Sequence, residues 1–365
     1  MDSNKTRLLK LGMDDFEREL FPLDRIQARK QMSQIDSFAR QQAKDTECYY
    51  CHKEKTSFCT SHSVPAFCLR KIATNGQLLT LNVVLNSPMD DNEVGINRAG
   101  VFHLICQDCD NQVFQAYEDP KSYLTAPPSR TLAQIAMKNY LKEISEKRLS
   151  RESYSALEVG FPNAILATEL KVIGLDLAEL SDAFERAKQG ALNGHGPSFN
   201  LMYYRLLDYV VPFACQCHIA LVCDINGTVI NDVYTITPEN RMQYLHIAVF
   251  PLEKSSAIML FADSQDKKYT KFQEQLSNLT PEDQLSLINY MVFSYTDNVF
   301  LAKSIPKSVF ENASFIETCR KYTPAFSETG QLDALPVAIK EYSFLKRHSI
   351  PNLLSIEYNL SPYSS

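Results

Sequence analysis

The chain has 365 residues, of which 45% are hydrophobic and 22% are charged, and its net charge is −6 at neutral pH. This length and composition suit about two globular domains of roughly 150 residues each and exclude a wholly disordered chain. The negative charge argues against a protein that coats nucleic acid non-specifically, although a local basic face could still bind phosphates.

The N-terminal residues 1–7 lack the apolar core of a signal peptide. The most apolar run, residues 203–223, contains Arg205 and Asp208, which a membrane-spanning helix rarely tolerates. We therefore expect a cytoplasmic protein without a membrane segment. Cytoplasmic thiols stay reduced, so metal binding explains paired cysteines better than disulfides do.

Hydrophobic residues in 12–45 recur at spacings of three and four, which predicts a helical N-terminal segment over residues 1–45. Residues 77–84 and 101–105 have the apolar, β-branched character of strands, and the second of them leads directly into Cys106. Residues 119–130 contain three prolines, which favours a linker.

The middle of the chain is predicted to be helical over residues 130–192. Thr131 and Gln134 match a capping box at the start of a helix that extends to about Lys147. A second, leucine- and alanine-rich helix over residues 165–189 ends near Gly190.

Residues 200–365 are predicted to form an α+β domain with an antiparallel sheet. Apolar and β-branched runs predict strands at residues 213–223, 229–236, 244–252 and 256–262. A turn signal at Asn226 and Gly227 separates the first two of these strands. Thr280 as N-cap and Pro281 at the first helical position predict a helix that extends to about Phe293.

Two Cys-x-x-Cys pairs, Cys48 with Cys51 and Cys106 with Cys109, are the strongest chemical signal in the sequence. Thiolates are soft ligands, and each short turn directs two sulfur atoms at one point. Two such pairs therefore predict a tetrahedral, structural Zn²⁺ site in a module over residues 46–120.

Between the pairs lies Ser61-His62-x-x-Pro65, and Asp110 directly follows the last cysteine. The order of CxxC, strand with histidine, loop, CxxC and helix over residues 48–118 resembles the treble-clef, ββα-metal type of HNH nuclease, within it the endonuclease VII and McrA-like branch. The resemblance implies a metal-dependent endonuclease that cleaves nucleic-acid phosphodiesters, with DNA the favoured substrate. By analogy, it also implies a bacterial defence effector.

In such a nuclease the four cysteines hold the structural Zn²⁺. The resemblance implies that His62 is the general base and that Asp110 is a ligand of a catalytic Mg²⁺ or Mn²⁺. Candidates for a second ligand of this ion are Glu118, Asn111 and Asn97. Glu118 could instead be a solvated carboxylate at the end of a helix. Basic residues that could face phosphate groups are Arg70, Lys71 and those of the cluster over residues 138–151.

Departures from the family pattern support an alternative hypothesis. Ser61 stands where many members have a metal-binding aspartate, and no residue clearly marks the second ligand. His62 could be structural or a zinc ligand, and Asp110 could be a helix N-cap. The alternative is a degenerate module that keeps zinc without catalysis and binds nucleic acid or a protein partner. An oligomer is a further option.

Together these segments predict an α+β fold. We expect an N-terminal helical segment, a zinc-bound treble-clef or ββα module, a helical middle, and a C-terminal antiparallel sheet with helices.

Overall fold

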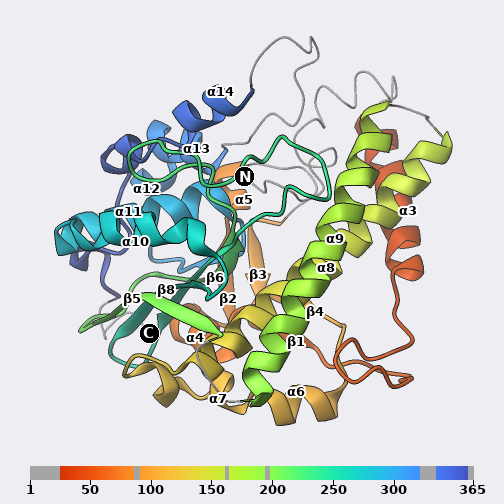
Figure 1. The fold of residues 1–365 in the computed structure, drawn as a ribbon, viewed down its shortest axis with the longest axis horizontal. Coiled ribbons are helices and arrows are strands. Elements are labelled where there is room, and N and C mark those ends of the chain that lie inside the picture. Colours follow the sequence, from red (N-terminus) through yellow and green to blue (C-terminus); the bar gives the residue numbers. More distant parts are fainter. Residues whose placement is uncertain (1–24, 86–90, 161–163, 194–197, 321–333, 361–365) are drawn as a thin grey trace.

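The structure is a computed structural model that describes residues 25–85, 91–160, 164–193, 198–320 and 334–360 (Figure 1). It has the α+β architecture that the sequence predicts. The strands are β1 (Ser61–His62), β2 (Gln77–Thr80), β3 (Glu93–Gly95), β4 (Val101–Phe102), β5 (Phe199–Leu207), β6 (Phe213–Ile219), β7 (Leu245–Pro251), β8 (Ser256–Asp263) and β9 (Val299–Leu301).

Helices surround the strands on several sides. The α-helices are α3 (Arg25–Gln42), α4 (Ala66–Ile72), α5 (Asn82–Leu85), α6 (Gln107–Val113), α7 (Gln115–Glu118), α8 (Ser129–Gly160), α9 (Ala164–Asn193), α10 (Thr270–Ser277), α11 (Pro281–Tyr295), α12 (Lys307–Phe310), α13 (Ala313–Cys319) and α14 (Ala334–Glu341). The 3-10 helices are η1 (Ile96–Arg98), η2 (Pro120–Tyr123), η3 (Lys267–Tyr269), η4 (Phe344–Ser349) and η5 (Ile356–Tyr358).

Seven strands form one antiparallel sheet with the order β3-β2-β9-β6-β7-β8-β5, and β1 pairs only with β4 among the described strands. Two strands of the sheet, β2 and β3, come from the segment between the two cysteine pairs. Leu79 of β2 lies opposite Leu301 of β9. Main-chain pairing therefore connects the cysteine-rich segment to the C-terminal sheet.

The large sheet is buried on both faces, because side chains that alternate along each strand enter two different cores. On β6, Phe213 and Cys215 pack in a core with α11, whereas Ala214 packs in a second core with α4 and α8. Figure 1 shows the long helices α8 and α9 side by side on one side of the sheet and α10 and α11 on the other. Burial on both faces explains why β6, β7 and β8 have nearly continuous apolar sequences.

The helical middle is confirmed, since α8 and α9 occupy it. The start of α11 is also as predicted, because the Thr280 side chain accepts a hydrogen bond from the Asp283 backbone N–H and Pro281 is the first helical residue. Of the N-terminal segment, α3 is helical, and residues 12–24 lie outside the described residues. No helix in the described part of the chain has both the length and the apolar character needed to cross a membrane.

The predicted strand over residues 77–84 is wrong at its C-terminal end. The strand ends at Thr80, and the chain continues into α5. The Asn82 backbone N–H donates to Thr80 Oγ1 (3.2 Å), and the Asn82 side chain donates to Asn92 Oδ1 (2.9 Å). These side-chain hydrogen bonds replace the strand ladder at that point, so the apolar residues that follow form a helical turn instead.

The predicted return strand over residues 229–236 is also wrong. Only a single bridge, between Cys223 and Val229, joins this segment to its neighbour. The buried side chain of Asn231 donates to the Leu221 carbonyl (2.9 Å) and accepts from the Gln243 backbone N–H (2.9 Å). These bonds hold the segment as a loop, and β6 pairs with β7 and β9 instead.

Candidate metal centre and adjoining polar site

The four cysteines of the two pairs come together in the structure. Their Sγ atoms all lie within 4.8 Å of one another. Cys48, Cys106 and Cys109 are buried, Cys51 is half-buried, and the Cys106 backbone N–H donates to Cys48 Sγ (3.2 Å). Four converging sulfur atoms suit Zn²⁺, and an amide donor stabilises a thiolate. The donor set therefore fits the zinc site that the sequence predicts.

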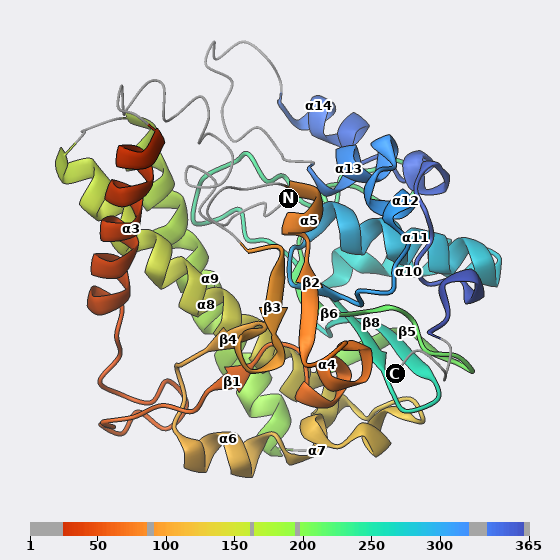
Figure 2. The same cartoon turned by 180° about the vertical axis from the view of Figure 1, so that it is seen from behind.

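Two short strands and a helix surround this cysteine cluster. β1 and β4 are antiparallel, with His62 opposite Val101, and the chain runs from β4 through Cys106 into α6. Cys106 is the N-cap residue of α6, and Cys109 lies within that helix. Figure 2 shows β1, β4, α4 and α6 grouped at one end of the molecule. The unit presents one histidine from a strand and one aspartate from the helix.

His62 is half-buried, and its Nε2 lies 3.1 Å from the Ile96 carbonyl oxygen. Because a carbonyl can only accept, this hydrogen bond requires the proton on Nε2, and the neutral ring then carries its lone pair on Nδ1. Burial lowers the pKa of His62, and the positive charges of Lys138 and Arg70 lower it further. These effects outweigh the hydrogen bond to Ile96 and the charge of Asp110, which raise it. His62 is therefore neutral at pH 7 and has the protonation state of a general base.

Asp110 lies on α6 and is tied to three side chains. Its Oδ1 accepts from Lys138 Nζ (2.7 Å) and Ser61 Oγ (2.9 Å), and its Oδ2 accepts from Cys59 Sγ (3.4 Å). Burial alone would raise the pKa of Asp110, but the charge of Lys138 and these hydrogen bonds outweigh it and lower the pKa. Asp110 is thus an anion, and Oδ2, whose only partner among the described residues is a weak thiol donor, retains room for another ligand.

Lys138 is fully buried, with 0% of its side chain exposed. Its ammonium lies 4.3 Å from the centre of the Phe114 ring and 5.4 Å from that of Tyr117, so aromatic faces as well as Asp110 stabilise the charge. Lys138 therefore does not face phosphate groups as part of a surface cluster, and that expectation is wrong. Lys147 of the same cluster is also buried, in ion pairs with Asp176 and Glu143.

The other predicted residues differ in their positions. Glu118, at the end of α7, is open to solvent, although desolvation by the surrounding protein raises its pKa. The charges of Lys138, Asp110 and Arg70 also act on it, and all three act on His62. Lys138, Asp110 and Arg70 therefore lie within electrostatic range of both His62 and Glu118.

Arg70 and Lys71 are exposed in the last turn of α4, and neither forms an ion pair with a described carboxylate. Arg70 is the one of the two whose charge reaches His62 and Glu118. Asn97 and Asn111 are exposed, and Asn111 accepts from the Gln107 side chain (3.1 Å). Nothing in these contacts directs either asparagine toward Asp110.

Within the described ranges, the four cysteines are the one group of three or more ligating side chains close enough to hold a metal ion. His62, Asp110 and Glu118 do not form a second group. Mg²⁺ is commonly held by one or two carboxylates together with substrate phosphates and water. Asp110 Oδ2 would supply one carboxylate ligand, which is the smallest number that such a site uses. A catalytic ion here would therefore depend on substrate and water for most of its ligands.

Sequence reasoning missed the role of Lys138. A signal was present, because Lys138 lies among Ile135, Met137 and Leu141 in a stretch of α8 that is almost wholly buried. A lysine within such an apolar stretch must meet a carboxylate or an aromatic face to be stable. The sequence pattern does not reveal this pairing, because the partner Asp110 is 28 residues away in sequence.

Comparison with known proteins found no family model, no curated protein and no solved structure that matches this chain.

Proposed function

We propose that this protein is a metal-dependent endonuclease of the HNH type that hydrolyses nucleic-acid phosphodiesters, with DNA as the favoured substrate. One observation carries the proposal. His62 is held through Nε2 with its Nδ1 lone pair available, within electrostatic range of Asp110, on a strand and helix that the cysteine cluster anchors. The resemblance of residues 48–118 to the HNH module supports the same assignment.

In this mechanism His62 Nδ1 accepts a proton from the attacking water, whose oxygen bonds to phosphorus. The bond from phosphorus to the leaving oxygen breaks, and solvent protonates that oxygen. A divalent ion, when bound at Asp110 Oδ2, would supply charge stabilisation for the phosphate. Arg70, which is exposed and within electrostatic range of His62, is placed to bind a neighbouring phosphate of the nucleic acid.

Cleavage assays with a His62→Ala variant test the proposal. Wild-type protein is incubated with supercoiled plasmid, linear duplex, single-stranded DNA and RNA in the presence of Mg²⁺ or Mn²⁺. Loss of a general base lowers rates by about 100- to 10,000-fold, so His62→Ala should cleave that much more slowly. His103→Ala is the matched control, because His103 is exposed one residue after β4. Equal cleavage by wild type and His62→Ala would refute the role of His62.

The pH dependence of cleavage gives a second prediction. His62 must be neutral to accept a proton, so the rate should rise with pH as His62 loses its own proton and should then reach a plateau. Because the pKa of His62 is lowered, the pH at which the rate is half-maximal should lie below the ordinary histidine pKa of about 6.5. The measurement is log kcat/KM between about pH 5 and pH 8 at saturating metal. A midpoint above neutrality, or a rate that falls as the pH rises from about 5 to about 7, would contradict the assignment.

A second candidate function is a zinc module that binds nucleic acid or a protein partner without catalysis. The ion pair between Asp110 and buried Lys138 favours it, because an ammonium already neutralises the carboxylate that the nuclease needs as a metal ligand. Titration with Mn²⁺ separates the two candidates. Binding beyond the zinc equivalent, together with cleavage, supports the nuclease. The absence of both in wild-type protein supports the non-catalytic module.

A further inference from the structure

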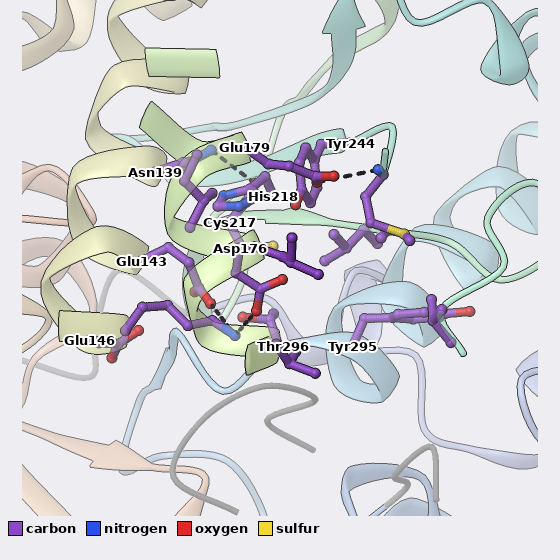
Figure 3. Close-up of a pocket in the computed structure, with 18 of the residues that line it drawn as sticks. Asn139, Glu143, Glu146, Asp176, Glu179, Cys217, His218, Tyr244, Tyr295 and Thr296 are labelled. Atoms are coloured by element: carbon purple, nitrogen blue, oxygen red, sulfur yellow. Dashed lines mark hydrogen bonds and ion pairs between the residues drawn. The ribbon is translucent and has the colours of Figure 1, made fainter. Parts of the chain in front are cut away.

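A cavity of about 200 Å³ adjoins the middle of α8. Its walls come from α8, α9, β6 and the loop over residues 233–244, and Figure 3 shows the side chains that line it. Asn139, Lys142 and Glu143 of α8 line the cavity, whereas Lys138 of the same helix pairs with Asp110. His62, Asp110, Lys138 and Glu118 are absent from the lining of the cavity, so cation binding here is independent of the proposed nuclease function.

The walls of this cavity are acidic. Five carboxylates line it against two ammonium groups, which leaves a net charge of −3 when all are ionised. The carboxylates are Glu143, Glu146, Glu169, Asp176 and Glu179. Low-dielectric walls that carry one sign of charge concentrate ligands of the opposite sign, so the cavity favours a cation.

The two lysines do not offset the whole of this charge. Lys142 pairs with Glu146, and Lys147 pairs with Asp176 and, at 3.9 Å, with Glu143. Glu179 lies further along α9, and its Oε2 accepts the Met242 backbone N–H (3.3 Å). Figure 3 shows Glu179 near Tyr244 and His218. Glu179 is therefore a carboxylate of the cavity wall that, among the described residues, forms no ion pair with either lysine.

Aromatic side chains form part of the cavity wall beside the carboxylates. Tyr244, Tyr295 and Tyr342 line it, and the rings of Tyr295 and Tyr342 lie 4.5 Å apart. Tyrosine faces attract ammonium and guanidinium groups. Tyr295 is 93% buried, and among the described residues its hydroxyl oxygen has no hydrogen bond of ordinary geometry, although the Val222 backbone also acts on it. A ligand that donates an N–H could satisfy this acceptor.

A metal ion is a poorer fit than an organic cation. Among the described residues, the carboxylates of the cavity do not form a group of three ligands around one point. The Lys147 ammonium already occupies the position between Asp176 and Glu143. A cavity of this size also has room for a ligand with an apolar body, and Val172, Leu180 and Ile219 are available to contact it.

We propose that this cavity binds a small organic cation, with its ammonium or guanidinium group beside Glu179 and its apolar or aromatic body against the tyrosines. The wall combines charged side chains with apolar and aromatic ones, which are the two kinds of contact that an organic cation requires. The cation replaces no protein ion pair, because Lys142 and Lys147 keep their partners.

Isothermal titration of the full chain with two probes and their neutral isosteres tests the proposal. Phenethylamine is compared with 2-phenylethanol, and choline with 3,3-dimethylbutan-1-ol. At least one cation should bind with a Kd of about 1 mM or tighter and about tenfold more tightly than its isostere. Absence of binding by both cations, or equal binding by cation and isostere, would overturn the proposal.

A charge variant locates the site. Glu179→Gln keeps the shape and the hydrogen bond to Met242, and it should weaken binding of the cation about tenfold while leaving the isostere unaffected. Glu185→Gln, on an exposed part of the same helix, is the control and should bind as wild type does. Far-ultraviolet circular dichroism and the Tm verify that both variants fold. Unchanged cation binding by folded Glu179→Gln would exclude this cavity as the site.

Discussion

A Cys106→Ser variant should lose its zinc and unfold the cysteine-rich segment. Serine is a poor Zn²⁺ ligand, and the binding of structural zinc contributes about 10–16 kcal/mol in small zinc-finger peptides. Cys48, Cys106 and Cys109 belong to the same core as Ile105, Phe114 and residues of α8. Loss of the metal should therefore also weaken the packing of α8 and lower the Tm of the whole protein. The measurements are zinc content by mass spectrometry and the Tm by calorimetry.

Cys59→Ser is the matched control for this variant. Cys59 lies in the same segment but outside the cysteine cluster, and serine can still donate to Asp110. This control should keep one equivalent of zinc and a nearly unchanged Tm. If Cys106→Ser retained both its zinc and its cooperative melting transition, the structural role of the cluster would be disproved.

An Asp110→Ala variant should lose about 3–5 kcal/mol of unfolding free energy, because it leaves the Lys138 ammonium buried without a counter-charge. The double variant Asp110→Ala with Lys138→Met should recover much of this loss, since an apolar replacement of a buried ion pair is often tolerated. Urea denaturation at neutral pH measures both values. The recovery would show that the cost arises from the unpaired lysine and not from the missing carboxylate.

An exposed ion pair gives the comparison. Asp182 pairs with Arg241 at the surface, with half or more of each side chain in solvent, so Asp182→Ala should change the unfolding free energy by at most about 1 kcal/mol. If Asp110→Ala proved as stable as Asp182→Ala, the Lys138 ammonium would not depend on Asp110. The same result bears on activity assays, because a loss of cleavage in Asp110→Ala combines a folding defect with the loss of a metal ligand. Asp110→Asn is the better catalytic variant.

Several parts of the fold could be predicted because their causes are local in sequence. The two Cys-x-x-Cys turns carry their own ligand geometry, and Thr280 with Pro281 specifies the start of α11 through hydrogen bonds within four residues. Hairpin β7–β8 was similarly recognisable, because its two strands are apolar and adjacent. For these elements, side chains near in sequence supply the free energy that selects the structure.

Other parts depended on partners distant in the chain. Residues 229–236 have strand-like composition, but hydrogen bonds of Asn231 with Leu221 and Gln243 keep this segment out of the sheet. β2 belongs to the large sheet because β9, more than 200 residues later, lies beside it. Local propensity is weak compared with such tertiary contacts, so the sequence pattern alone assigned both segments incompletely.

The candidate site divides in the same way. By itself the sequence determined the four cysteines that come together as a candidate zinc site. It also made His62 and Asp110 candidates, from short motifs around those cysteines. Only the tertiary structure decided that His62 is held through Nε2, that Asp110 pairs with Lys138, and that acidic and aromatic side chains line one cavity beside α8 and α9. The physical reason is that ligand spacing is a property of a few consecutive residues. Ion pairs and cavities arise where helices and strands from different parts of the chain pack together.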